Sequence, residues 1–551
     1  LCLAVPAYAE TQDAAEAPPV YQAATPEAAG KDEPFSCYTY DDFDQELQGY
    51  WSEEQGIWYL FETSTQAVEE TELYYTGDIE AVSAGTLGAG NQVVTGAFQE
   101  RGDRGELTAA DGTVYTVVVL QSDLPSVYIT LNGTTLEQIH ADKDAKYPGN
   151  SVTIMDPSGN YNLNVEGNVE MKGRGNTTWR CYEKKGYQIK FDKKTDVFGM
   201  GKAKKWVLLA NAGDDSMMRT QLVYQMADNL EMDFVPSFEY VDLWISGEYR
   251  GTYMLGEKVE PGSSRLDLSE DAGAIFEHDG AFYAEEEHWF YSAMLEREFA
   301  LKEINNEDEA VIESAMADFE AAVDELAVYL YSTPSYEVTL EELSTMIDVD
   351  SFAKYFLVNE YAMNRESFYT SFYWYKDGPG DVLHLGPIWD FDTCMGNNGS
   401  TYTDNYGQNH VLFQYLLAAP AFYERTQELL ALYWDDFTSM TDNVDVLATQ
   451  LETSAEMNYL RWDVLGKPNP KGGTDFHNTY EEAVTAVKDW LSGREEGFHV
   501  TRSTVVTSEI SDDCYEMTVT FQDGEPHQQI RFGVWSLEDG QDDLAWYTAS
   551  Q

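Results

Sequence analysis

Residues 348–398 read DVDSFAKYFLVNEYAMNRESFYTSFYWYKDGPGDVLHLGPIWDFDTCMGNN, and the rest of the chain is best understood as a scaffold that presents this stretch. Its first third has apolar residues at helical spacing, with an aspartate in the first three residues that can cap the helix. A polar turn follows at 364–367, and then two strand-like runs, 371–376 and 383–385, flank a Gly/Pro turn. The second run leads into WDFD at 389–392. We therefore predict a helix, an acidic turn, a hairpin and a second acidic turn, with carboxylates from both turns converging on one site.

The composition limits the classes of partner. With 551 residues the chain has room for roughly two to four domains, and a hydrophobic content of 43% is enough for sizeable cores. A formal net charge of −65 argues against nucleic acid or an anionic membrane as partner, because phosphate binding rests on basic patches. It is typical of a solvated acidic surface, or of one that collects divalent cations. We predict no transmembrane segment, since no apolar run of about 18 residues occurs.

The N-terminal residues have the pattern of an export signal. An apolar start is followed by Ala7-Tyr8-Ala9, the small-x-small pattern of a cleavage site, so we expect residues 1–9 to be a signal peptide remnant. An ordinary frayed terminus is the alternative. Residues 10–35 are expected to be a disordered linker, and the protein to be secreted and associated with the cell surface. Five cysteines without CxxC spacing favour neither a zinc site nor a disulfide framework.

The remaining chain divides by its periodicity. Short aromatic and β-branched runs predict a β-rich module at 36–119, which serves as a spacer or as a binding domain. A larger domain is expected at 124–498, β-rich at first and then helical from the amphipathic segment 306–332 onward. Further helices are predicted at 421–437, 444–460 and 480–494. After 498 the pattern turns to β again, which predicts a separate module at 500–551. The predicted fold class is α+β.

A basic island in this acidic chain marks a candidate anion site. Fifteen of the 33 lysines and arginines lie between 172 and 265. Inside the island, the turn at 173–178 can bring the backbone of Gly175 and Asn176 and the side chain of Arg174 to a phosphate. Strand alternation at 187–191 directs Lys190 away from its apolar neighbours, where it can neutralise phosphate charge. An ordinary turn and an exposed strand lysine are the alternatives.

The two acidic turns supply candidate metal ligands and a candidate base. Asp390 and Asp392 flank an aromatic residue, so only one of them is expected to face the site; a solvated turn or Ca²⁺ ligation are the alternatives to Mg²⁺. Glu366 lies 24 residues earlier, where a carboxylate can orient an attacking hydroxyl, and a helix-end carboxylate is the alternative. Ser371 lies where protein kinases place a metal-binding asparagine.

Five segments together resemble the CotH kinase family, secreted atypical kinases named after a spore-coat protein. They are MKGRGNTTW (171–179), KKGYQIKF (184–191), FGMGKAKKWVLLANAGDDSMMR (198–219), ISGEYRGTYMLGEKVE (245–260) and GPIWDFD (386–392). The resemblance covers roughly 124–498 and implies an atypical protein-kinase-like fold of two lobes, a β-rich N-lobe and a helical C-lobe. It also implies ATP with Mg²⁺, or Mn²⁺ in its place, and phosphorylation of Ser or Thr in a protein on or outside the cell surface.

The resemblance also implies roles for individual residues. Asp390 takes the role of the metal-binding aspartate, with Asp392 and Glu366 as further ligands. Arg174 and Lys190 become phosphate contacts, together with the turn residues Gly175 and Asn176. Arg219 matches a recurrent position of the family and is grouped here with the cofactor-binding residues.

One position departs from the family pattern. Glu366 stands where the family usually has an aspartate in an Asn-x-Asp turn, and a misplacement of ~1 Å can lower a rate about a hundredfold. The alternative function is therefore a weak or inactive kinase-like surface scaffold, and a glycan-binding protein with Ca²⁺-binding loops is a third possibility. The tail RFGVWSLEDGQDDLAWYTA (531–549) resembles the start of a GBS Bsp-like repeat, which implies cell-wall or glycan contact through the β modules.

Overall fold

The computed structural model describes residues 2–4, 35–88, 92–293, 295, 297–470, 476–511, 514–521, 531–535 and 545–548, with side chains described between 35 and 502. The linker predicted at 10–35 lies outside the described residues apart from Phe35, and so does most of the signal peptide remnant predicted at 1–9. Parts of the predicted module at 500–551 also lie outside them.

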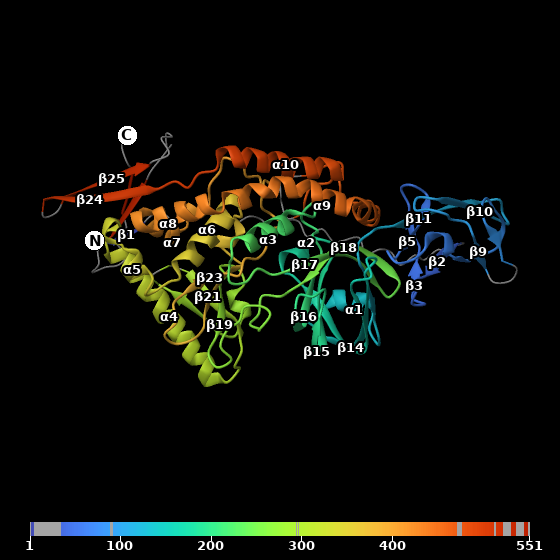
Figure 1. Cartoon of the computed structure of the whole chain (residues 1–551), viewed down its shortest axis with the longest axis horizontal. Coiled ribbons are helices and arrows are strands. Elements are labelled where there is room, and N and C mark those ends of the chain that lie inside the picture. Colours follow the sequence, from blue (N-terminus) through green and yellow to red (C-terminus); the bar gives the residue numbers. More distant parts are fainter. Residues whose placement is uncertain are drawn as a thin grey trace.

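The first folded unit is a sandwich of two five-stranded sheets, seen at one end of the molecule in Figure 1. One sheet has the order β3-β2-β6-β9-β8, with bounds Glu46–Gln48, Ser36–Tyr40, Leu73–Thr76, Val93–Thr95 and Thr86–Leu87. The other has the order β4-β5-β11-β10-β7, with bounds Tyr50–Ser52, Ile57–Glu62, Val114–Gln121, Arg104–Ala109 and Ile79–Val82. Alternate residues of both sheets share one buried core, because successive side chains of a strand point to opposite faces.

The second unit is a closed seven-stranded barrel, which the sequence did not predict. Its order is β12-β13-β14-β15-β16-β18-β17, with bounds Ser126–Thr130, Tyr147–Met155, Asn162–Arg174, Gly186–Asp196, Lys202–Leu209, Glu248–Gly256 and Phe238–Ile245. Closure requires the parallel pairing of β12 with β17, which lie more than a hundred residues apart. Tyr187, Ile189 and Phe191 point into the barrel and are fully buried, which confirms the predicted alternation along β15. Two short helices connect strands of the barrel: α1 (Leu136–Ala141) lies between β12 and β13, and α2 (Thr177–Cys181) lies between β14 and β15.

A further five-stranded sheet packs against the helices and contains the hairpin predicted within residues 348–398. Its order is β20-β21-β19-β22-β23, with bounds Trp289–Ser292, Arg297–Ile304, Ala274–His278, Phe372–Lys376 and His384–Leu385. One large hydrophobic core joins this sheet to α3 (Arg219–Asn229), α4 (Glu309–Ser332) and α6 (Val349–Ala362), and to the outer face of β16–β18. Phe276 of β19 stacks on Phe319 of α4, with ring centroids 3.8 Å apart. The barrel and the helical part are therefore packed together through a continuous apolar interface.

The predicted order of helix, turn, hairpin and turn is confirmed, and both hairpin strands begin one residue later than predicted, at Phe372 and His384. Helix α6 spans Val349–Ala362, and Asp348 caps it by accepting the backbone N–H of Ser351. The first acidic turn contains a short 3₁₀ helix, Glu366–Phe368, and strands β22 and β23 form the hairpin. The second acidic turn follows at 389–392, after β23.

The remaining helices include two that were not predicted, Leu340–Leu343 and Val411–Ala418, and one predicted break is corrected. They are α3 (Arg219–Asn229), α4 (Glu309–Ser332), α5 (Leu340–Leu343), α7 (Val411–Ala418), α8 (Pro420–Leu432), α9 (Trp434–Arg461) and α10 (Tyr480–Gly497). Separate helices were predicted at 421–437 and 444–460, whereas the break falls at Tyr433 and α9 is continuous. Between the buried residues Met440 and Val444, Asp442 is exposed and the polar residues 441 and 443 are half-buried, so this polar stretch continues the helix instead of ending it.

The described structure is a mixed α+β protein with β-rich N-terminal sheets, a barrel and C-terminal helices, as predicted at the level of fold class. Figure 1 shows α9 and α10 side by side along one edge, with α9 reaching toward the barrel. After α10 the described residues form four strands, β24 (Ser503–Ser511), β25 (Cys514–Phe521), β26 (Arg531–Trp535) and β27 (Ala545–Thr548), and β1 (Cys2–Ala4) pairs with β26. Within the described residues, every helix is too short or too polar to span a bilayer.

Candidate functional site

The second acidic turn presents one carboxylate to solvent from a buried frame. Trp389 and Phe391 are buried, whereas Asp390 between them is exposed and has a φ of 56°. A non-glycine residue rarely adopts this left-handed conformation, and such residues cluster at functional sites. The side-chain amide of Asn364 donates to the Asp390 carbonyl over 2.9 Å, so the first acidic turn holds the second in place.

A relay of polar contacts supports the Asp390 carboxylate from the hairpin. The Ser371 hydroxyl donates to Asp390 Oδ2 over 2.9 Å, and Ser371 itself has a φ of 56°. The Ser371 N–H donates to Glu277 Oε1 over 2.6 Å, and Lys302 Nζ lies 3.0 Å from Glu277 Oε2. Glu277 and Lys302 come from the adjacent strands β19 and β21. The sheet β20-β21-β19-β22-β23 therefore positions the Asp390 carboxylate.

Sequence reasoning missed Glu277, which is buried at 4% exposure in a strand whose other residues are also buried. Burial raises the pKa of its carboxyl to about 7, and Lys302 opposes that rise. The only sequence signal was an acid in the otherwise apolar run AIFEH, which by itself does not indicate what the acid contacts.

The Gly-rich turn meets the second acidic turn through Arg174. Its guanidinium carbon lies 4.9 Å from the centroid of the Trp389 ring, next to Asp390 in the chain. Gly175 has a φ of 99°, and a Cβ there would collide with the Thr178 hydroxyl, so this position requires glycine. Two segments more than two hundred residues apart, both predicted to belong to the site, are therefore brought together.

Asn176 has a structural partner of its own. Its Oδ1 accepts from Lys143 Nζ over 3.1 Å, and its backbone lies at the start of α2. Lys143 thus adds a positive charge beside the turn, a contribution that the sequence did not point to.

Asp392 faces a different part of the molecule from Asp390. A Cβ built on Gly213 would lie 3.0 Å from Asp392 Oδ2, which places this carboxylate beside the loop that precedes α3. Asn397 ties the same region together, because its amide donates to both the Asp392 and the Gly213 carbonyls, over 2.6 and 2.7 Å. The two aspartates are therefore directed to separate neighbours, Asp390 to the hairpin and Asp392 to this loop.

Two tyrosines, Tyr224 buried and Tyr373 half-buried, feel the charges of the site. Desolvation raises the pKa of both well above the ordinary value; the negative charge of Asp390 raises it too, and the positive charge of Arg174 lowers it. The Tyr224 hydroxyl is buried without a hydrogen-bond partner among the described residues. Both tyrosines stay neutral beside the carboxylate, and they provide an apolar wall with polar tips.

Glu366 opens the 3₁₀ helix of the first acidic turn and is half-buried. Its N–H donates to Asn364 Oδ1 over 3.3 Å. Since the amide of Asn364 also reaches the Asp390 carbonyl, one asparagine joins the predicted base and the predicted metal ligand.

Lys190 lies on the outer face of the barrel, between Glu170 and Lys205 on the neighbouring strands. Lys205, which the sequence did not single out, has ion pairs with Glu260 and Glu303 at 3.3 and 3.5 Å. No contact in the described structure joins Lys190 to the Arg174–Asp390 group, so its assignment as a phosphate contact stays a prediction.

Arg219 is buried at 1% exposure and forms an ion pair with Asp214. Its guanidinium also donates to the Met395 carbonyl over 3.4 Å. Arg219 therefore links the loop before α3 to the loop after Asp392. Because the Arg219 side chain is enclosed, its predicted role in cofactor binding would be indirect, through the two loops that it joins.

The residues around Asp390 fit the needs of an ATP–Mg²⁺ complex. Mg²⁺ usually keeps several waters and is held by one or two carboxylates together with substrate phosphates. Asp390, exposed and oriented by Ser371, supplies such a carboxylate, and Arg174 with the Gly175 turn supplies positive charge and backbone N–H groups. Within the described ranges, no three Asp, Glu, His or Cys side chains are gathered into a cluster that would hold a metal without a ligand's help.

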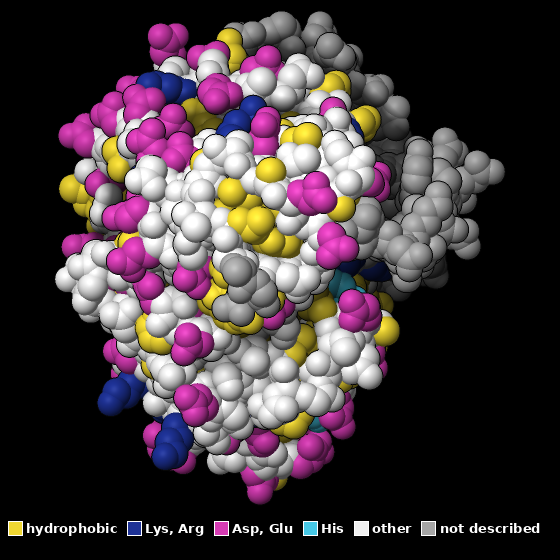
Figure 2. Space-filling model, turned by 90° about the vertical axis from the view of Figure 1, so that its right-hand side faces the viewer, with side chains coloured by type: hydrophobic (Ala, Val, Ile, Leu, Met, Phe, Trp, Pro, Cys, Tyr) yellow, Lys and Arg dark blue, Asp and Glu magenta, His cyan; other side chains and the backbone are white. Residues whose placement is uncertain are grey.

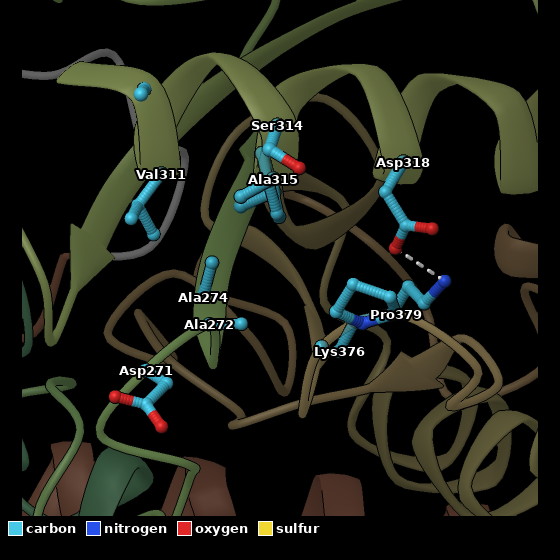
Figure 3. A pocket seen from close by; sticks show the side chains of 12 residues that line it. Asp271, Ala272, Ala274, Val311, Ser314, Ala315, Asp318, Lys376 and Pro379 are labelled. Atoms are coloured by element: carbon cyan, nitrogen blue, oxygen red, sulfur yellow. Dashed lines mark hydrogen bonds and ion pairs between the residues drawn. The ribbon is translucent and has the colours of Figure 1, made fainter. Parts of the chain in front are cut away.

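A cavity of about 310 Å³ lies elsewhere, between α4, the start of β19 and the hairpin turn. Figure 3 shows its mostly small side chains, with the Lys376–Asp318 ion pair of 2.7 Å at one end. None of the predicted site residues lines this cavity.

Comparison with known families places most of the barrel and the helical part within one family domain. A family model described as CotH kinase protein matches residues 171–497 of the 551-residue chain. The match begins in β14, three residues before Arg174, and includes Glu366, Asp390 and Asp392. No curated protein matches the chain.

Proposed function

The chain belongs to the CotH kinase family, as the five sequence segments predicted, and we propose that it transfers the γ-phosphate of ATP to serine or threonine hydroxyls of a protein substrate. The observation that supports this most directly is the arrangement of Arg174 over Trp389 beside the exposed Asp390 carboxylate. It brings a positive group and a metal-binding group to the same place, which phosphoryl transfer requires.

Each residue of the site has a task in this reaction. Bound ATP supplies the phosphoryl group, and Mg²⁺ offsets the charge of its phosphates. Asp390 would hold the metal, while Ser371 and Asn364 fix the orientation of that aspartate. Arg174 and the turn at Gly175 bind phosphate oxygens, and Glu366 accepts a hydrogen bond from the attacking hydroxyl.

The place of action is also a proposal. The signal-like pattern at 1–9 and the net charge of −65 support export and a substrate on or outside the cell surface. A kinase-like arrangement of two lobes, with the barrel as N-lobe and the helical part as C-lobe, fits the position of Arg174 at the end of β14. The resemblance of residues 531–549 to a GBS Bsp-like repeat supports surface contact and stays a prediction.

Glu366 favours a second candidate, a protein that binds nucleotide but transfers phosphate slowly or not at all. A glutamate places its carboxylate about one bond length further from the backbone than the aspartate usual in the family, and catalysis is sensitive to such displacements.

The test is phosphoryl transfer by the full chain, with radiolabelled ATP, Mg²⁺ or Mn²⁺ and a serine-rich acidic acceptor protein. We expect label on the acceptor, and loss of that label in Asp390→Asn. The matched control is Asp489→Asn, the same change at an exposed aspartate of α10, which should keep full transfer. Nucleotide binding by thermal shift without any transfer would favour the second candidate, and no binding at all would contradict both.

A further inference from the structure

A group of polar side chains occupies core positions at one end of the N-terminal sandwich. Glu62 is the last residue of β5 and shares the inner face of that strand with Trp58 and Leu60. Across the sandwich, Thr39 continues the inner face of β2, on which Cys37 lies. Strand alternation therefore directs a carboxylate and a hydroxyl into the space between the sheets, where apolar side chains normally lie.

These side chains are enclosed and lack hydrogen-bond partners. Glu62 has 0% exposure and neither of its carboxylate oxygens forms a hydrogen bond within the described structure. The hydroxyls of Thr39 and Thr71 lie close enough to interact with this carboxylate, but neither contact has hydrogen-bond geometry. The other buried oxygens without a partner in this part of the chain are Asp41 Oδ2, Thr63 Oγ1 and Gln66 Oε1.

These buried side-chain atoms, two from Glu62 and one from each of the other five residues, are all oxygens. The N-terminal sandwich offers almost no positive charge to balance them. Residues 36–119 contain no lysine or histidine, and their two arginines are Arg101 and Arg104. Arg101 pairs with Asp123 and Arg104 is exposed. Figure 2, which faces this end of the molecule, shows many acidic side chains and few basic ones.

A buried carboxylate without a donor or a counter-charge is unfavourable. Burial, with a smaller contribution from the nearby Asp41 and Asp42, raises the pKa of Glu62 to about 8. Either a proton or a cation must therefore accompany Glu62 in the folded protein.

We propose that Glu62, Asp41, Thr39 and Thr71 form a binding site for a hard divalent cation, best suited to Ca²⁺. Two carboxylates balance its charge, and Ca²⁺ accepts six to eight oxygen ligands, neutral ones included, in flexible geometry. Mg²⁺ demands near-ideal octahedral geometry and keeps its waters, so an enclosed set of hydroxyl and carboxylate oxygens suits it less well.

The site adjoins the junction between the sandwich and the barrel. The Ser64 N–H donates to Ser126 Oγ of β12 over 3.0 Å, two residues after Glu62. Gln121 holds the same segment from the other side, because its amide donates to the Thr63 and Gln66 carbonyls over 2.6 and 2.7 Å. A cation bound at Glu62 would therefore fix the segment that contacts the barrel, outside the residues 171–497 that match the family.

The test is calorimetric titration of the full chain, freed of metal by chelation, with CaCl₂ and separately with MgCl₂. We expect the wild type to bind one Ca²⁺ equivalent that Glu62→Gln lacks or binds about tenfold or more weakly, because affinity follows the charge of the ligands. Glu54→Gln, the same change at an exposed glutamate of the module, should titrate like the wild type. Ca²⁺ should also slow amide hydrogen exchange at residues 57–73 in the wild type and not in Glu62→Gln.

Two results would overturn the proposal. Identical titrations of the wild type and Glu62→Gln would show that Glu62 carries a proton, and equal affinity for Mg²⁺ would contradict the assignment of Ca²⁺. If Glu62→Gln does not fold, Thr39→Val, which is nearly the same size, provides the same comparison: it should weaken Ca²⁺ binding, and unchanged binding would contradict the site.

Discussion

The hydroxyl of Ser371 donates a hydrogen bond to Asp390 Oδ2 over 2.9 Å, and both residues have a φ of 56°. Left-handed backbone at two non-glycine residues in contact is unfavourable unless the surroundings impose it. Here Glu277 holds the Ser371 N–H and Asn364 holds the Asp390 carbonyl. The backbone conformation that exposes Asp390 is thus maintained by two buried polar side chains.

Removal of the Ser371 hydroxyl should impair phosphoryl transfer without unfolding the chain. A hydrogen bond to a charged group contributes about 1.5–3 kcal/mol, so Ser371→Ala should lower kcat/KM roughly tenfold to a hundredfold. Steady-state kinetics with varied ATP and Mg²⁺ measure this. Ser344→Ala, at an exposed serine after α5, is the control, and an unchanged kcat/KM in Ser371→Ala would show that the Asp390 orientation does not depend on this bond.

Arg174→Lys should weaken ATP binding more than it affects turnover. A lysine keeps the charge but loses the planar group that lies over Trp389 and that binds phosphate in a bidentate manner. We expect KM for ATP to rise about tenfold, with a smaller change in kcat. Arg502→Lys, at an arginine 5.9 Å from the Tyr423 ring, is the matched control, and equal effects of the two changes would argue against a phosphate contact.

Glu366→Asp tests the one departure from the family pattern. If the carboxylate at this position orients the acceptor hydroxyl, the shorter side chain should raise kcat by roughly tenfold or more. Glu366→Gln keeps the size and removes the charge, and should abolish the step. An active wild type that is unaffected by Glu366→Gln would remove Glu366 from the mechanism.

Glu277 should give the protein a measurable pH dependence of stability. Its carboxyl pKa is raised from 4.5 to about 7, so between these values the folded state keeps a proton that the unfolded state has released. Stability from this group is therefore present below about pH 4.5 and is lost as the pH rises to about 7. Denaturant unfolding of the wild type and Glu277→Gln should show their difference falling by up to about 1.4 kcal/mol per pH unit across this range. A difference that is constant with pH would contradict the raised pKa.

Arg219→Met should destabilise the fold strongly. Removal of one partner from a buried ion pair costs about 3–5 kcal/mol, because Asp214 keeps an uncompensated charge. Thermal unfolding should show a clear fall in Tm, with ATP affinity preserved in the folded fraction if Arg219 acts only through the loops it joins. The control is Arg425→Met, whose pair with Asp350 is partly exposed and should contribute about 1 kcal/mol or less.

The local patterns in the sequence predicted the elements that carry the site. Helical spacing located α6, and alternation located the buried face of β15, because both depend on residues close in the chain. The break between α8 and α9 was predicted between 437 and 444, whereas it falls at Tyr433. The polar residues 441–443 look like a loop when their packing is unknown. The seven-stranded barrel was not predicted, because its closure depends on the pairing of β12 with β17.

The family, the helix–turn–hairpin–turn of 348–398 and the choice of Asp390 as a candidate ligand could be inferred from the sequence, because these depend on residue type at short spacing. Which distant groups meet at Asp390 became clear from the folded structure alone. It placed Arg174 over Trp389, set Glu277 behind Ser371, and directed Asp392 to a separate loop. It also enclosed Glu62 among oxygens without a counter-charge. These contacts join residues far apart in the chain, and the packing of sheets and helices, not local propensity, determines them.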